Sequence, residues 1–207
     1  MRNQQFDILK KYFPDKAVPI VARYYQDMRF KLLFVAPRKT KLGDFRAPQN
    51  PGGICTITLN ADMQHYNMTI TFVHELAHYT TFVKHGHKVK PHGKEWKKQY
   101  RELMQPFLSN DVFPDVLLDA IHQHLQHIGA STYSDKELLR AIRALERQPE
   151  HYITLENLPE NSLFRLHNGR TFIKGARLRT RYKCQCTTTK RWYLIQGLCM
   201  VEPLTPS

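Results

Sequence analysis

Cysteine and long apolar runs are both scarce in this sequence of 207 residues. The four cysteines are Cys55, Cys184, Cys186 and Cys199. Their irregular spacing does not suggest a disulfide framework, so a reducing compartment is expected. The longest uninterrupted apolar run is about five residues, far short of the ~20 that a membrane-spanning helix needs, and residues 1–13 do not resemble a signal peptide. These absences predict a soluble, cytoplasmic protein with no membrane partner.

Acidic residues are also few. The chain has 18 Asp and Glu against 31 Lys and Arg, which gives a formal net charge of +13. Residues 1–110 and 151–207 are basic, whereas residues 111–150 are slightly acidic. Such an excess indicates an anionic partner such as nucleic acid, or simply a basic surface. The composition, 42% hydrophobic and 24% charged, excludes a disordered or fibrous protein.

The hydrophobic periodicity of residues 1–110 alternates between helix and strand. The predicted helices are residues 16–28, 69–85 and 94–107, and the predicted strands are residues 30–35 and 54–59. Residues 37–53 hold three prolines and three glycines, which predicts a long loop or an irregular hairpin.

The rest of the chain changes period near Pro149. The pattern of residues 111–150 predicts two helices, and a capping box formed by Ser134 and Glu137 marks the start of the second one. Strand patterns follow at 164–166 and 171–173 around the turn signal Asn168-Gly169, then at 176–186, 191–195 and 198–201. The sequence therefore predicts an α+β protein with three parts: a domain over 1–110, a helical connector over 111–150 and a small antiparallel β-domain over 151–207.

The strongest chemical signal is His74-Glu75-Leu76-Ala77-His78, an H-E-x-x-H motif inside the helix predicted over 69–85. Residues four apart lie on one face of a helix, so both imidazoles can reach one metal ion. The flanking residues are apolar almost all round, which predicts a buried helix, where two histidines and a glutamate are costly unless they coordinate something. One zinc ion with an open position would activate a water, and Glu75 would accept its proton as general base.

A third ligand is needed, and several residues are candidates. Thr81 and Lys84 stand where a metzincin would have glycine and histidine or aspartate, so that class is excluded. A thermolysin-like enzyme would use a glutamate on the next helix as its third ligand, and Glu102 lies near the expected sequence separation from the motif. His85 and His87 lie at the predicted helix end, and His92 follows Pro91 at the start of the next helix, from where it can face the first helix across a loop.

The combination of motifs resembles a known family. His74-Glu75-Leu76-Ala77-His78, a basic loop, and His92-Gly93-Lys94-Glu95-Trp96-Lys97 together resemble the SprT-like (Spartan-like) zinc metalloprotease family, and so does the strand Ile57-Thr58-Leu59-Asn60. The resemblance covers roughly residues 15–107. It implies a zincin-like fold with His74, His78 and His92 as zinc ligands, Glu75 as the catalytic residue, and proteins on or near DNA as substrates.

The C-terminal region departs from that family, many of whose members end in a zinc ribbon with paired cysteines. Here the C-terminal region has only three cysteines, Cys184, Cys186 and Cys199, which are too few for such a ribbon. We therefore interpret them as core-packing residues in preference to ligands of a second zinc ion. A single strand over 176–186 would place four basic side chains on one face, where they could contact a phosphate backbone. These are Arg177, Arg179, Arg181 and Lys183.

Two functions of different classes follow from these patterns. The favoured one is a zinc-dependent peptidase that acts on protein or peptide substrates. The alternative is a nucleic-acid-binding or regulatory protein whose zinc site is structural or weakly active, closed by His85 or His87 as a fourth ligand.

Overall fold

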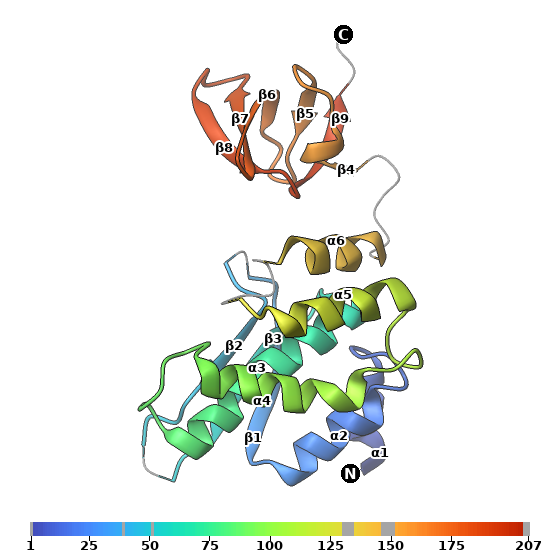
Figure 1. Cartoon of the computed structure of the whole chain (residues 1–207), viewed down its shortest axis with the longest axis vertical. Coiled ribbons are helices and arrows are strands. Elements are labelled where there is room, and N and C mark those ends of the chain that lie inside the picture. Colours follow the sequence, from blue (N-terminus) through green and yellow to red (C-terminus); the bar gives the residue numbers. More distant parts are fainter. Residues whose placement is uncertain (1, 39, 51, 130–134, 146–151, 205–207) are drawn as a thin grey trace. The chain divides into compact units, whose positions relative to one another are not determined.

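The computed structural model describes residues 2–38, 40–50, 52–129, 135–145 and 152–204, which form two compact units, Met1–Leu145 and Glu146–Ser207 (Figure 1). The helices are α1 (Arg2–Lys10), α2 (Val18–Asp27), α3 (His65–His85), α4 (Lys94–Met104), α5 (Asp115–Gln126) and α6 (Lys136–Leu145). The strands are β1 (Phe30–Val35), β2 (Gly43–Arg46), β3 (Cys55–Asn60), β4 (Ile153–Thr154), β5 (Leu163–Arg165), β6 (Thr171–Leu178), β7 (Arg181–Cys186), β8 (Trp192–Gln196) and β9 (Met200–Leu204). The molecule is thus α+β with two sheets. Across the described ranges, no helix is both long and apolar enough for a membrane span.

The sheet of the first unit has the order β1-β3-β2. β1 and β3, both predicted from their β-branched and aromatic residues, pair in parallel. β2 lies inside the segment 37–53, which was predicted as a long loop or an irregular hairpin, and it pairs antiparallel with β3, as the hairpin alternative requires. The side chains of Arg38 and Asn60 hold the preceding loop in place: Arg38 Nε donates to Asn60 Oδ1 at 2.8 Å, and Asn60 Nδ2 donates to the carbonyl of Lys41 at 3.1 Å.

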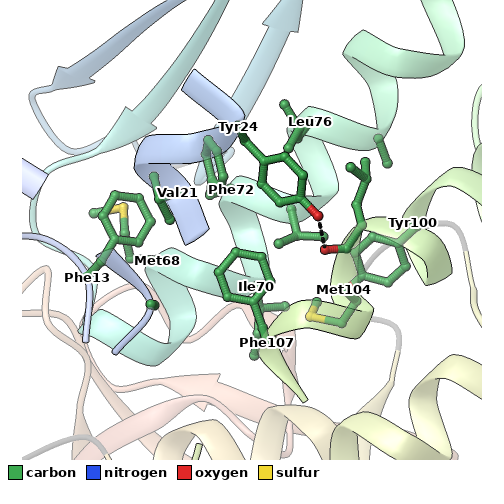
Figure 2. Packing of buried hydrophobic residues seen from close by; sticks show 14 of the residues in the cluster. Phe13, Val21, Tyr24, Met68, Ile70, Phe72, Leu76, Tyr100, Met104 and Phe107 are labelled. Carbon is green, nitrogen blue, oxygen red and sulfur yellow. Dashed lines mark hydrogen bonds between the residues drawn. The ribbon is translucent and has the colours of Figure 1, made fainter. Parts of the chain in front are cut away.

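The motif helix α3 packs against both β2 and β3 and crosses α4 (Figure 1). It begins at His65, four residues before the predicted start, because the Gln64 side chain accepts hydrogen bonds from the backbone N–H groups of Tyr66 and Asn67. It ends at His85, and Gly86, with a φ of 60°, caps it by donating its backbone N–H to the Phe82 carbonyl. The apolar side chains of α3 join those of α2 and α4 in one core, where Tyr24 donates a hydrogen bond to the Leu103 carbonyl (Figure 2).

The segment predicted as a connector belongs to this same unit. Leu117 and Ile121 of α5 and Leu138 and Ile142 of α6 are buried in the core that also holds α3. Both helices therefore lie in one compact unit with the preceding residues, whereas charge and periodicity predict a separate connector over 111–150. Asp135 Oδ1 accepts the backbone N–H groups of Glu137 and Leu138 in the first turn of α6. Ser134, the predicted cap, lies outside the described residues.

The second unit is a six-stranded antiparallel sheet with the order β4-β9-β5-β6-β7-β8. β5 and β6 flank Asn168-Gly169 as predicted, and Gly169 has a φ of 80°. One face of the sheet packs around Phe164, Phe172, Cys184 and Cys186, so the prediction of core cysteines is confirmed for this pair.

The strand predicted over 176–186 was wrong, because that segment is a hairpin. β6 ends at Leu178 and β7 begins at Arg181, with Arg177 paired to Tyr182 and Leu178 to Arg181. Arg179 lies in the turn with a φ of 50°. The four basic residues therefore do not line one face: only Arg181 and Lys183 share a face of one strand. Periodicity failed here because alternation continues through a two-residue turn without a glycine or proline to mark it.

Candidate metal centre

His74 and His78 lie one turn apart in the middle of α3. Between Asn67 and Thr81 every residue of this helix is buried except these two, which are half-buried. The packing of α3 on the sheet and on α4 therefore leaves one opening along the helix, and both imidazoles occupy it.

His92 reaches the same place from a tight turn that precedes α4. The backbone N–H of Gly93 donates to the carbonyl of Lys90 at 3.0 Å, with Pro91 second and His92 third in the turn. His92 has a φ of 58°. Proline followed by a residue of positive φ is the arrangement of a type II turn, whose third position ordinarily favours glycine or asparagine. A histidine in this conformation is locally strained, and strained residues of this kind are concentrated at functional sites.

The three imidazoles converge through their Nε2 atoms. The Nε2 of His78 lies 3.3 Å from that of His74 and 3.0 Å from that of His92, and the remaining pair is 3.2 Å apart. A tetrahedral zinc ion with Zn–N bonds of ~2.0–2.1 Å places its nitrogen ligands about 3.3 Å apart. The donor set and its spacing therefore fit one zinc ion.

The electrostatics of the cluster keep its nitrogens available as ligands. Burial, with a further contribution from the neighbouring imidazoles, lowers the pKa of His74 to about 3 and that of His78 to about 4. The pKa of His92 is lowered as well, first by burial and then by Lys97. Neutral imidazoles offer a lone pair to a metal ion, whereas protonated ones cannot.

Trp96 supports all three rings from the side of α4. Its indole centroid lies 4.7 Å from the rings of His74 and His92 and 5.3 Å from that of His78. The side chain is 1% exposed and stacks on Tyr100 at 5.1 Å. Trp96 is thus a packing residue, and it fixes the orientation of the three candidate ligands.

Glu75 faces β2, the strand that the sequence did not reveal. The backbone N–H of Phe45 donates to the Glu75 carboxyl, and the Phe45 ring lies parallel to His78 with centroids 6.5 Å apart. Burial, and secondarily Asp44, raises the pKa of Glu75 to about 7, against the opposing Phe45 hydrogen bond and Arg38. A divalent cation beside it would favour the carboxylate form, which is the form that accepts a proton.

Gly43 of β2 makes room for this carboxyl. A Cβ atom at position 43 would lie 2.7 Å from both Cγ and Oε1 of Glu75 and 2.8 Å from Cγ2 of Thr71. We expect Gly43→Ala to displace the Glu75 carboxyl and to lower kcat for the hydrolysis that the sequence predicts at this centre by about 100-fold, since a 1 Å misplacement at a reacting site has effects of this size. Zinc content, measured by mass spectrometry, should stay unchanged.

Gly52→Ala is the matched control for that variant. A Cβ at Gly52 meets nothing within 4 Å, although its φ of 78° strains any side chain. This variant should lose stability without a loss of kcat. Equal losses of kcat in both variants would contradict the role assigned to Gly43.

The other candidate ligands lie apart from the cluster. Among the residues that the structure describes, His74, His78 and His92 are the one group of metal-binding side chains whose donor atoms converge. His85 and His87 are exposed, with His87 packed against Phe82. Glu102 is engaged with Gln99, whose Nε2 donates to it at 3.0 Å. The four cysteines are free thiols and belong to no such group.

A comparison with protein families matches residues 13–117 to the SprT-like family. The match covers half of the chain and includes β1 to β3, α3, α4 and all three histidines. This chain belongs to the SprT-like family. Comparisons with curated proteins and with solved structures found no match. Membership of the SprT-like family suggests a metalloprotease-type function, and the three histidines can hold the metal ion that such a function requires.

The SprT-like centre also has neighbours that sequence reasoning missed. Tyr100 lies 6.1 Å from His74 and 5.9 Å from His124, measured between ring centroids. His124 is 2% exposed and its Nδ1 is 2.9 Å from Asp135 Oδ2, which links α5 to α6. Position 124 lies beyond the segment matched to the SprT-like family. It comes three residues after Ile121 and four after Ala120, on the apolar face of α5, and this helical spacing is the signal that could have identified it as a buried histidine.

Proposed function

We propose that this protein is a zincin-like metallopeptidase that hydrolyses peptide bonds with one zinc ion held by His74, His78 and His92. The observation that carries the proposal is the convergence of three Nε2 atoms within 3.0–3.3 Å, next in sequence to a buried carboxyl aligned by β2. A zinc ion bound there would lower the pKa of a water ligand to about 7 and polarise a peptide carbonyl.

The chain's own residues supply the rest of the chemistry. The Glu75 carboxylate accepts the proton of the attacking water and returns it to the nitrogen of the leaving amine. Its hydrogen bond from the Phe45 N–H orients the carboxyl, and the space over Gly43 accommodates it. Burial of Trp96 and Tyr100 keeps solvent away from the side of the ligands that faces the core.

The alternative of a closed structural site needs a fourth protein ligand. Neither His85 nor His87 takes that place in the described part of the chain. Three histidines with room for a water ligand are typical of catalytic zinc, whereas structural zinc is four-coordinate through the protein. This favours the peptidase over the regulatory module. By family resemblance, we propose proteins bound on or near DNA as the substrate class.

Metal removal tests the proposal directly. The full chain loaded with zinc should contain one zinc ion per molecule by mass spectrometry and should cleave an unfolded protein substrate, assayed both with and without DNA. Chelation should abolish this cleavage, and added zinc should restore it, because Glu75 has no activated water without the metal. Absence of cleavage by the zinc-loaded chain under both conditions, with zinc stably bound, would favour the structural alternative.

A further inference from the structure

The six-stranded sheet of the second unit has two edges that differ in kind (Figure 1). At one edge β4 has only two residues, and the next strand, β9, contains Pro203. Short strands and prolines both limit further pairing at an edge. At the other edge β8 has five residues, Trp192–Gln196, without a proline or a charge, and its register with β7 has no bulge. β8 therefore lacks the devices that ordinarily protect an edge strand.

The hydrogen-bond register shows which backbone groups of β8 face its open side. The N–H of Cys186 donates to the carbonyl of Arg191 at 2.9 Å, in the same register that pairs β7 with β8. Backbone groups alternate in direction along an antiparallel strand, so the odd-numbered residues of β8 bond to β7. Trp192 and Leu194 therefore present their N–H and C=O groups to the side on which the described sheet has no further strand. We call these backbone groups the β8 edge.

The side chains beside the β8 edge are apolar and exposed. Trp192 is 54% exposed and Leu194 is 53% exposed. Both side chains lie on the outer face of the sheet, because the alternating residues Tyr193 and Ile195 pack against the core. An added strand would therefore find both unpaired backbone groups and an apolar surface for its own outward side chains.

The charge around this edge is of one sign. Between Asn161 and Val201 there is no Asp or Glu, while nine Lys and Arg fall in the same interval. Arg181 and Lys183 of β7 are exposed on the outer face, where Arg181 is paired with Gln196 at the end of β8. A strand added to β8 would lie two strand spacings, about 9.6 Å, from Arg181. Arginine and glutamate side chains together span that distance.

We propose that the β8 edge binds an extended acidic segment of a partner protein as an additional antiparallel strand. Main-chain hydrogen bonds supply affinity in this mode of recognition, and alternate side chains supply specificity. Apolar residues of the segment would lie on Trp192 and Leu194, and a carboxylate at its end would face Arg181. A second copy of this chain would bring the same uncompensated positive charge, and a nucleic acid has no alternating amide groups to continue the ladder. The proposal is independent of peptide hydrolysis by the first unit.

The probe is a capped, labelled peptide of about seven residues, with glutamate at both ends and alternating threonine and valine between them. In the proposed register its valines lie opposite Trp192 and Leu194, and one glutamate lies opposite Gln196. Binding to the full chain is measured by anisotropy of the label. Tryptophan fluorescence should change on binding, and the change should be absent in Trp192→Phe, because Trp96, the second tryptophan, is 1% exposed.

Methylation of peptide nitrogens tests the backbone pairing without altering the protein. Residues directly opposite Trp192 and Leu194 exchange their hydrogen bonds with them, so the valine N–H groups face β8 and the threonine N–H groups face away. N-methylation of both valines should weaken binding by roughly 5- to 150-fold, since two hydrogen bonds are lost. N-methylation of two threonines is the matched control and should have little effect. Equal losses from the two methylated peptides would overturn the proposal.

The same pairing is tested from the side of the protein by Leu194→Pro. The N–H of Leu194 faces away from β7, so a proline at this edge position leaves the β7 ladder intact. It should weaken binding by about 10-fold or more, and Leu194→Ala, which keeps the N–H, should lose less. Thermal unfolding of both variants should resemble that of the wild type. Equal affinity of Leu194→Pro and the wild type would contradict strand addition.

Charge is tested by Arg181→Gln, which should weaken binding about 2- to 5-fold at low salt and less at high salt. It should have no effect on a peptide with glutamines in place of the glutamates. Arg165→Gln on β5 is the matched control, because its guanidinium already lies 3.3 Å from Glu202. Binding of an oligothymidylate but not of the peptide would overturn the proposal in favour of nucleic acid. Dimerisation that Leu194→Pro abolishes, without peptide binding, would assign the edge to a second copy instead.

Discussion

Glu75→Gln is expected to lower peptide-bond hydrolysis by about 100-fold or more while zinc binding stays close to that of the wild type. Glutamine keeps the size of the side chain, and its carbonyl oxygen can still accept the Phe45 N–H that holds Glu75. It cannot take a proton from water, so general-base catalysis is lost, and this contributes typically 10²- to 10⁴-fold. The rate should be measured on an unfolded protein substrate with the zinc-loaded chain, including any self-cleavage.

Glu102→Gln is the control for this change. Glu102 is a partly exposed glutamate of α4, 4.0 Å from Lys98 and hydrogen-bonded to Gln99, apart from the histidine cluster. Its conversion to glutamine should leave hydrolysis and zinc content unaltered. Wild-type activity in Glu75→Gln would contradict the proposed mechanism, and loss of zinc in that variant would show that Glu75 acts on the metal site instead.

His92→Asn should weaken zinc binding by more than about 100-fold. The loss of a ligand should exceed the 10- to 100-fold effect typical of changes in the residues that support ligands. Asparagine is the appropriate replacement because it tolerates the left-handed conformation, whereas alanine would add strain at a φ of 58°. Zinc affinity is best measured by competition with a chelator of known strength, alongside thermal unfolding of the metal-free chain.

The matched control is His87→Asn, since His87 is exposed and packs against Phe82 just before the His92 turn. It should bind zinc as the wild type does. The assignment of the third ligand fails if His87→Asn loses the metal while His92→Asn retains it. Similar unfolding temperatures of the metal-free wild type and His92→Asn would show that the loss concerns the metal and not the fold.

Local chemistry made much of the first unit predictable. β1 and β3 follow from short runs of β-branched and aromatic residues, and α4 follows from helical periodicity. β2 could not be predicted in this way. Gly43-Asp44-Phe45-Arg46 has little intrinsic strand preference, and it is extended because β3 offers it hydrogen-bonding partners. The hairpin at Arg179 was missed because its turn has neither glycine nor proline.

The sequence by itself identified the residues that are proposed to carry the chemistry. The four-residue spacing of His74 and His78 follows from helix geometry, and His92 follows from the resemblance of its motif to the SprT-like family. Only the tertiary structure decided how that chemistry is arranged. It brought the Nε2 atoms of the three histidines within 3.3 Å of one another and placed Gly43 and Phe45 against Glu75. It also added α5 and α6 to the core that holds α3, and it separated the basic residues of β6 from those of β7. The reason is physical: spacing within one helix is fixed by local backbone geometry, whereas contacts between distant segments depend on the packing of the whole chain.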